Sequence, residues 1–332
     1  MQRNVFLVII LWFLLFLARI TQIGGIDPTY TEPPNLLLKP LQESFTKNLD
    51  QLLPYPQSVL LSGILLGSQG NLPFFLKKEL QATSTIHIVV VSGQNLTMLA
   101  GFLMSLAPFI GRKKTIILTL GAIVFYSVLT GLGIPVIRAA IMVSLVFLAK
   151  LMGKDGLDWW ILLLTVGVML LINPNWILSI SFQLSVMATL GVVVMAPILL
   201  PFFKQVPNIL REDLVVSLSA QILTLPFIAY NFGQISIIGV LVNGLVLWCI
   251  SLVMISGFFT LAVSFLSTTL GQIIGLLPGV LLTYFIYIVE IFSKIPFGSV
   301  RVGESSLILW VGYYLLIGGL VWGLRIKINK PT

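Results

Sequence analysis

The sequence predicts an all-α integral membrane protein that crosses the bilayer many times. Hydrophobic residues make up 58% of its 332 residues, and charged residues only 9%. A soluble domain carries about 25% charged residues, so this chain has too few charges to form an ordinary aqueous surface. Its apolar residues also fall into long blocks, and a helix needs about 20 of them to cross the hydrocarbon core. The blocks predict about ten transmembrane helices, a re-entrant or interfacial helical segment and at least one interrupted helix.

The chain divides into four segments by composition. They are an N-terminal transmembrane helix (1–20), an extracytoplasmic polar linker with an amphipathic segment (21–57), a multi-helix membrane domain (58–324) and a basic tail (325–332). Arginines that can snorkel flank the first apolar run, Val5–Ala18. A signal peptide is the alternative there, although no small-residue cleavage site follows the run. Val59–Leu66 is too short to span, which favours a re-entrant or interfacial turn.

Nine further apolar blocks follow within the membrane domain. They run approximately over Ile86–Ile110, Thr115–Leu132, Val136–Met152, Trp159–Ile172, Ile177–Leu200, Leu214–Tyr230, Ile235–Phe265, Leu270–Phe292 and Leu307–Leu324. The block Ile235–Phe265 exceeds the length of one span. We therefore expect it to bend or break near Asn243 and Gly244.

Charge predicts the orientation and excludes several kinds of site. The basic clusters at 111–114 and 325–330 favour the cytoplasmic side, so we expect a bacterial cytoplasmic-membrane protein with both termini inside. The net charge of +8 fits either such loops or an anionic substrate. Cys249 is the single cysteine and His87 the single histidine, which excludes a disulfide framework and the usual zinc ligand sets. No phosphate-loop motif is present. The sequence thus predicts no cofactor, no metal and no enzymatic activity.

The stretch HIVVVSGQNLTMLAGF places polar groups inside an apolar run. Gly93 permits a break in the helix, and His87, Ser92, Gln94 and Asn95 surround it. Unsatisfied polar groups are costly in hydrocarbon, and irregular backbone persists there only against protein or water. We expect an interrupted helix that lines a conduit. The alternative is that these side chains join neighbouring helices by hydrogen bonds.

The stretch YSVLTGLGIPVIRAAIM predicts a tight turn that carries a cation. Gly131 suits the turn, and Pro135 suits the first turn of the next helix. Arg138 then lies in that N-terminal turn, where the helix dipole disfavours a cation. We expect an anionic partner nearby. It is either Glu290, on the same outer side in the predicted topology, or lipid phosphates, or a passing polyanion.

Uncharged polar groups recur in the later blocks. Amides suit either helix packing or the wall of a pore that must release its cargo. Pro226 should kink its helix, because it removes one backbone hydrogen bond. The candidate lining residues in these blocks are Gln183, Ser185, Gln221 and Asn243.

Several of these motifs, in this order, resemble the competence domain of the ComEC/Rec2 family. The resemblance rests on HIVVVSGQNLTMLAGF, LTGLGIPVIRAAIM, INPNWILSISFQLSVMATLG and LPFIAYNFGQISIIGVLVNGLV, and it covers roughly residues 58–324. It implies a channel that passes single-stranded DNA through the cytoplasmic membrane during natural transformation. Family motifs map onto His87, Ser92, Gly93, Arg138, Gln183, Leu184, Ser185, Gln221, Pro226 and Asn243. Asn95 departs from the pattern, because the family usually has a second histidine there.

The resemblance also implies partners. Full-length members carry an OB-like domain and a metallo-β-lactamase-like domain, and neither is expected in this sequence. Besides single-stranded DNA and membrane lipids, we expect a separate DNA receptor, a nuclease and a cytosolic ATPase or helicase. Two alternatives to the channel stay open: a transporter of a small or lipid-linked substrate, and a non-conducting structural membrane subunit.

Overall fold

The protein is built almost entirely from helices. The computed structural model describes residues 2–27, 37–68, 72–89, 91, 93–153, 158–296, 298–302 and 307–328. Within these ranges the chain forms two compact units, and helix α11 contributes to both. The first unit comprises residues 1–40 and 92–186, and the second comprises residues 41–91 and 187–332. Of the predicted regions, parts of the linker (28–36), Ser92 and the end of the tail (329–332) lie outside the described residues.

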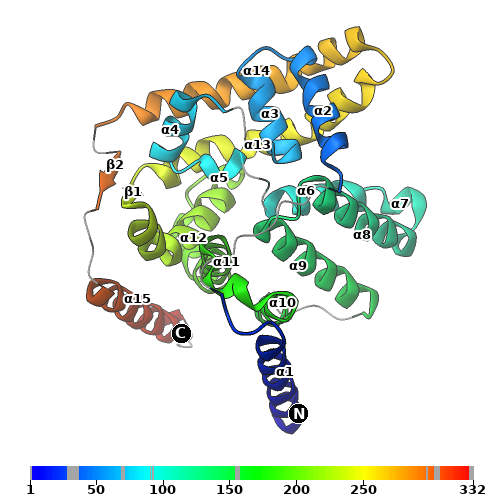
Figure 1. The fold of residues 1–332 in the computed structure, drawn as a ribbon. Coiled ribbons are helices and arrows are strands. Elements are labelled where there is room, and N and C mark those ends of the chain that lie inside the picture. The colour runs from blue at the N-terminus through cyan, green and yellow to red at the C-terminus, as the bar shows by residue number, and fades with distance from the viewer. Residues whose placement is uncertain are drawn as a thin grey trace. The chain divides into compact units, whose positions relative to one another are not determined.

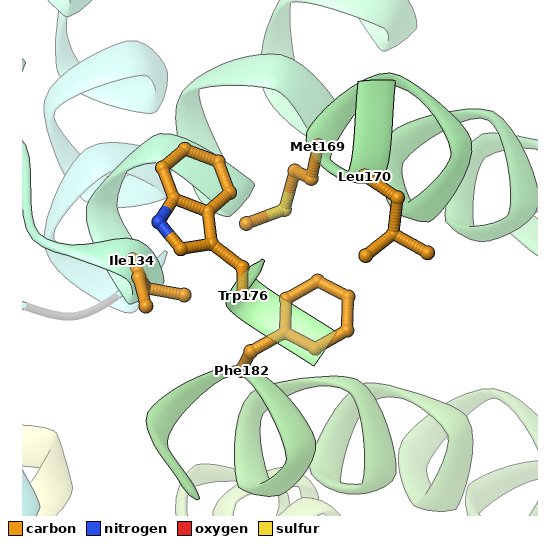
Figure 2. Packing of buried hydrophobic residues seen from close by; sticks show 5 residues of the cluster. All are labelled: Ile134, Met169, Leu170, Trp176 and Phe182. Carbon is orange, nitrogen blue, oxygen red and sulfur yellow. The ribbon is translucent and has the colours of Figure 1, made fainter. Parts of the chain in front are cut away.

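The first unit gathers its helices around an apolar cluster. Its elements are α1 (Gln2–Gln22), α6 (Gly93–Met104), α7 (Ala107–Ile110), α8 (Arg112–Leu129), α9 (Ile134–Leu151), α10 (Asp158–Ile172), η1 (Pro174–Leu178) and the first part of α11 (Ile180–Leu199) (Figure 1). The buried cluster joins α9, α10, η1 and α11 through Ile134, Met169, Leu170, Trp176 and Phe182 (Figure 2). The indole of Trp12 on α1 donates a hydrogen bond to the carbonyl oxygen of Gly167 at 3.1 Å, which attaches α1 to α10.

The second unit is organised around a long helical hairpin. Its elements are α2 (Lys39–Leu52), α3 (Gln57–Leu66), α4 (Phe74–Ala82), α5 (Ile86–Val89), the rest of α11, η2 (Leu200–Phe203), α12 (Asn208–Phe232), β1 (Gln234–Ser236), α13 (Gly239–Ser264), α14 (Thr268–Ser293), β2 (Ser299–Arg301) and α15 (Leu307–Ile328). Helices α13 and α14 form the hairpin, and α3 packs against both. A Cβ on Gly257 of α13 would meet Leu61 and Leu65 of α3 at 2.8 and 3.0 Å. Strands β1 and β2 pair antiparallel.

Five helices are long and apolar enough to cross a membrane. They lie at Ile134–Leu151, Ile180–Phe203, Leu210–Phe232, Gly239–Ser264 and Thr268–Ser293, and four shorter apolar helices accompany them within the described ranges. The block Ile86–Ile110 falls short because it is divided among α5, α6 and α7. Helix α8 begins with three cations. The structure therefore supports a helical membrane protein. The total of about ten transmembrane helices stays a prediction.

The predicted interruption and the predicted bend have different outcomes. The apolar run that contains His87 is interrupted, because α5 ends at Val89 and α6 begins at Gly93. The break expected near Asn243 and Gly244 does not occur, since α13 continues through both positions as one helix of 26 residues, and the alternative of a bend stays a prediction. Gly244 is instead a contact point, where a Cβ would come 2.8 Å from Cγ of Leu214 on α12.

Candidate functional site

The start of helix α6 and the guanidinium of Arg138 lie in direct contact within the first unit. A Cβ on Gly93 would stand 3.2 Å from Nη2 of Arg138 and 3.2 Å from Cβ of Ala139. The absence of a side chain at Gly93 therefore allows α9 to approach the first turn of α6. The first backbone N–H groups of a helix have no intrahelical acceptor and carry partial positive charge. Arg138 thus adds a full positive charge beside a positively polarised helix end.

A second helix N-terminus contributes to the same place. Helix α8 ends at Leu129, the backbone turns through Gly131 with φ of +96°, and Pro135 lies in the first turn of α9. Arg138 follows one turn later, and its Nη1 lies 3.3 Å from Sδ of Met142, a weak acceptor. The cation and two helix N-termini therefore belong to one small region. Such an arrangement favours an anion.

The apolar cluster of the first unit positions Arg138. Ile134 of α9 belongs to the buried cluster, and Ile137, next to Arg138 in the chain, packs against it. Trp176 and Phe182 complete the cluster from η1 and α11 (Figure 2). Because one side of α9 is fixed by this packing, the adjacent arginine is held at the start of α6.

The polar residues after Gly93 divide between the surface and the interior of the first unit. Gln94 is exposed. Asn95 is 2% exposed, and its side chain lies close to the hydroxyl group of Tyr126 on α8. Thr97 donates to the carbonyl oxygen of Gly93 at 2.9 Å. Asn95 therefore joins α6 to α8, which is the packing role that the sequence left open, while Gln94 faces outward.

Cysteine labelling should separate these two neighbours. We expect a cysteine at Gln94 to react with a small water-soluble thiol reagent and a cysteine at Asn95 to stay inert. The native Cys249 is fully buried and contributes no background. Leu96→Cys, at another fully buried position, serves as the inert control. Rapid labelling at Asn95 would contradict its placement between α6 and α8.

His87 belongs to the second unit and contacts backbone. It lies on the short helix α5, and its Nδ1 is 2.8 Å from the carbonyl oxygen of Ser84. Ser84 has φ of +57°, a left-handed conformation uncommon for a residue other than glycine. The histidine ring therefore contacts the backbone of the turn before α5.

The later amides have mostly structural partners. Gln183 donates to the carbonyl oxygen of Ile177 at 3.0 Å, which joins α11 to η1, and Ser185 lies half-buried on the same helix. Gln221 donates to the carbonyl oxygen of Ser236 at 2.8 Å, which joins α12 to β1. Asn243 differs, because its Oδ1 is buried and has no hydrogen-bond partner among the described residues. It is an available acceptor inside the second unit.

Pro226 and Glu290 also have defined places in the second unit. Pro226 lies within α12, which continues past it to Phe232. Glu290 accepts a hydrogen bond from Lys294 one turn later, at 2.7 Å. Glu290 thus has a cationic partner within its own unit, and its pairing with Arg138 stays a prediction.

A charge cluster that the sequence did not reveal surrounds Glu290. Glu79 of α4 interacts electrostatically with both Glu290 and Lys294. Partial burial, followed by the charge of Glu290, raises the pKa of Glu79, and Lys294 opposes the shift. The hydrogen bond with Glu290 raises the pKa of Lys294. Two residues separated by some 200 positions cannot be paired from sequence spacing alone, so no local signal announced this cluster.

The raised pKa of Glu79 predicts a pH-dependent stability. Because the folded state disfavours the ionised carboxylate, stability is greatest when Glu79 is protonated and falls as the pH rises through its pKa. We expect Glu79→Gln to weaken the loss of thermal stability between about pH 4 and pH 7, measured in detergent. Glu43→Gln on the exposed side of α2 is the matched control. Identical pH profiles for wild type and Glu79→Gln would rule out this effect.

The fold defines a class, a helical membrane protein, in which the guanidinium of Arg138 lies at the start of α6, after an interruption in an apolar run. Comparison with known proteins gives the family. The sequence matches the competence protein family over residues 64–327, and the chain belongs to that family. The resemblance identified from the motifs is thereby confirmed.

Two curated relatives extend the comparison. The chain is 28% identical over 221 residues to ComE operon protein 3 of Bacillus subtilis (strain 168), which covers 64% of this chain and 27% of that protein. It is 27% identical over 151 residues to the uncharacterized protein YcaI of Escherichia coli (strain K12), which covers 43% of this chain and 20% of that protein. The chain thus matches about a quarter or less of each relative. No solved structure matches it.

Proposed function

We propose that the protein takes part in DNA uptake as a membrane conduit that passes a single DNA strand through the cytoplasmic membrane. Membership of the competence family supports the process. The observation that carries the conduit role is the contact between Arg138 and Gly93 at the interrupted helix. It places a guanidinium at the start of α6, beside a break in an otherwise apolar run.

The chemistry of the site suits a phosphodiester backbone. Guanidinium groups form strong, planar hydrogen bonds with phosphate oxygens, and helix N-termini favour the same anions. Such contacts carry no sequence information, which fits a conduit that must accept any strand. Exposed Gln94 adds an uncharged donor and acceptor at the same helix end. A single cationic contact beside polar neutral groups allows entry without trapping the strand.

Other proteins complete the proposed process. In this proposal a separate receptor delivers the DNA, a nuclease supplies the single strand, and a cytosolic ATPase or helicase draws it inward. Membrane lipids surround the apolar helices. The amides Gln183, Gln221 and Asn243, together with His87 and the hydroxyl groups of Ser92 and Ser185, remain proposed contributors to the conduit.

Reconstitution in liposomes tests the proposal. Labelled single-stranded DNA is added outside vesicles that contain the protein, with and without a salt gradient, and protection from added nuclease is measured. We expect protein-dependent protection of single-stranded DNA and none of duplex DNA of the same length.

Two results would redirect the assignment. Passage of small anions without DNA would favour the small-substrate transporter. Passage of neither would favour the structural subunit. Empty vesicles and vesicles that contain an unrelated polytopic protein control for leakage.

A further inference from the structure

Helix α4 has two faces with opposite properties. Leu76 and Leu80 are fully buried, and the helix packs with this face against α14 and α5. The opposite face carries Phe74 and Phe75, which are 82% and 56% exposed. Two adjacent phenylalanines with this much exposure cost hydrophobic free energy in water. The exposed face therefore calls for a binding partner.

The exposed face also carries cations. Lys77 and Lys78 are both exposed and lie one helical turn from the phenylalanines. Side chains three or four residues apart on a helix are neighbours, with about 5–6 Å between their Cβ atoms. Each aromatic ring therefore has an ammonium group close to it on the same surface.

The order of these side chains around the helix discriminates between two kinds of partner. Each residue of an α-helix advances about 100°, which fixes that order. Across the exposed arc the residues follow one another as Lys77, Gln81, Phe74, Lys78, Ala82 and Phe75. A helix that lies in a lipid surface separates a continuous apolar face from a polar one. On α4 the rings and the cations alternate instead.

We propose that the exposed face of α4, formed by Phe74, Phe75, Lys77 and Lys78, is a docking surface for single-stranded DNA. Single-stranded nucleic acid presents unstacked bases and regularly spaced phosphates, and its binding proteins combine aromatic rings with cations. The rings accept stacked bases, and the lysines contact the phosphates between them. This inference rests on the proposed function, since it assigns the place where the strand is first bound.

The neighbouring charges fit this assignment. Glu79 lies at the edge of the exposed arc, where α4 meets α14. The positive charge of Lys294 partly offsets the rise in the pKa of Glu79. Lys294 has a side chain that is 68% exposed and adds a further cation next to α4. Lys294 forms an ion pair with Glu290 and lowers the cost of ionising Glu79, and the two lysines of α4 remain exposed at the surface.

Binding by the purified full chain in detergent tests the surface. Fluorescence anisotropy is measured with labelled oligo(dT) and with an abasic strand of the same length. We expect Phe74→Ala/Phe75→Ala to weaken oligo(dT) binding at least about tenfold and to change abasic binding little. Lys77→Gln/Lys78→Gln should weaken binding of both strands. It should also reduce the slope of log K against log salt concentration by about 1.4, at about 0.7 for each phosphate contact.

The controls separate loss of contact from loss of fold. Phe74→Tyr/Phe75→Tyr keeps both rings and should retain binding. Leu266→Ala, at a residue that is 85% exposed in the same unit, and Lys47→Gln, on the exposed side of α2, should bind like wild type. Wild-type binding by both α4 double variants would overturn the proposal. Strong quenching of the tryptophan fluorescence of Phe75→Trp by brominated lipid chains would also overturn the proposal, because it would show that this face of α4 lies in the membrane.

The same measurements keep this inference distinct from the conduit role. If the wild type passes DNA into liposomes while the α4 variants bind and pass it equally well, the docking surface is wrong and the conduit stands. If α4-dependent binding is found without passage, the conduit is wrong and the docking surface stands. No binding of either strand by the wild type would overturn the docking surface directly.

Discussion

Replacing Arg138 by glutamine is expected to reduce passage of single-stranded DNA strongly while abundance and membrane insertion stay near wild type. Glutamine keeps polar hydrogen-bonding capacity but removes the charge that stands 3.2 Å from the Cβ position of Gly93. Without it, the start of α6 offers a phosphate only the weaker field of helix N-termini. We expect liposome entry to fall at least about tenfold, the effect of losing roughly 1.4 kcal/mol of charge-assisted hydrogen bonding. Residual entry should also depend less on salt.

Two further substitutions define the cause of that effect. Arg138→Lys keeps the positive charge but loses the planar guanidinium, which can donate two parallel hydrogen bonds to a phosphate. It should therefore retain part of the DNA passage. Arg112→Gln, at an exposed arginine at the start of α8, controls for net charge. A different result would follow if Arg138 acts by pairing with Glu290. Arg138→Gln would then lower abundance, and Arg138→Gln/Glu290→Gln would restore both abundance and passage.

Introducing valine at Gly191 is expected to cause the largest loss of stability. Gly191 of α11 lies directly against the carbonyl group of Ser219 in α12, and a Cβ there would stand 3.2 Å from Cα of Ala220. The obstructing atoms are backbone, so they cannot rotate away, and the two helices would have to separate. We expect about 3 kcal/mol or more of destabilisation. Cellular abundance and thermal unfolding in detergent would measure it.

A matched glycine in an open position isolates the contact. Gly121 lies within helix α8, and among the described residues no atom outside the neighbouring backbone of this helix comes within 4 Å of its Cβ position. Gly121→Val removes the same backbone freedom without a clash and should change stability by less than about 1 kcal/mol. Equal effects of the two substitutions would show that the contact between α11 and α12 does not set the stability.

The helical fold was predictable because it depends on composition and block length. The interruption before α6 was also predictable, since Gly93 and its polar neighbours are costly inside an unbroken apolar helix. The role of Asn95 was not, because its partner Tyr126 is far along the chain on another helix. Sequence alone cannot distinguish a buried amide with a partner from one that faces water.

Two further features could not be predicted from the sequence: the role of Gly244 and the exposure of Phe74 and Phe75. Gly244 was interpreted as a helix breaker, yet in α13 it makes room for Leu214. A glycine serves either purpose, and only the neighbouring helix decides which. Phe74 and Phe75 stand in a short apolar stretch whose sequence does not indicate whether they are buried or exposed. Their exposure depends on which face of α4 packs against α14, and that choice is a tertiary property.

The close approach at Gly93 has an evolutionary consequence. A Cβ there would press on both the guanidinium of Arg138 and the methyl group of Ala139. The three positions are therefore not free to vary independently. A larger residue at position 93 should therefore favour a smaller residue at 139 or a shorter side chain at 138. Related sequences should therefore show linked substitutions at positions 93, 138 and 139, so that the start of the helix and the cation change together.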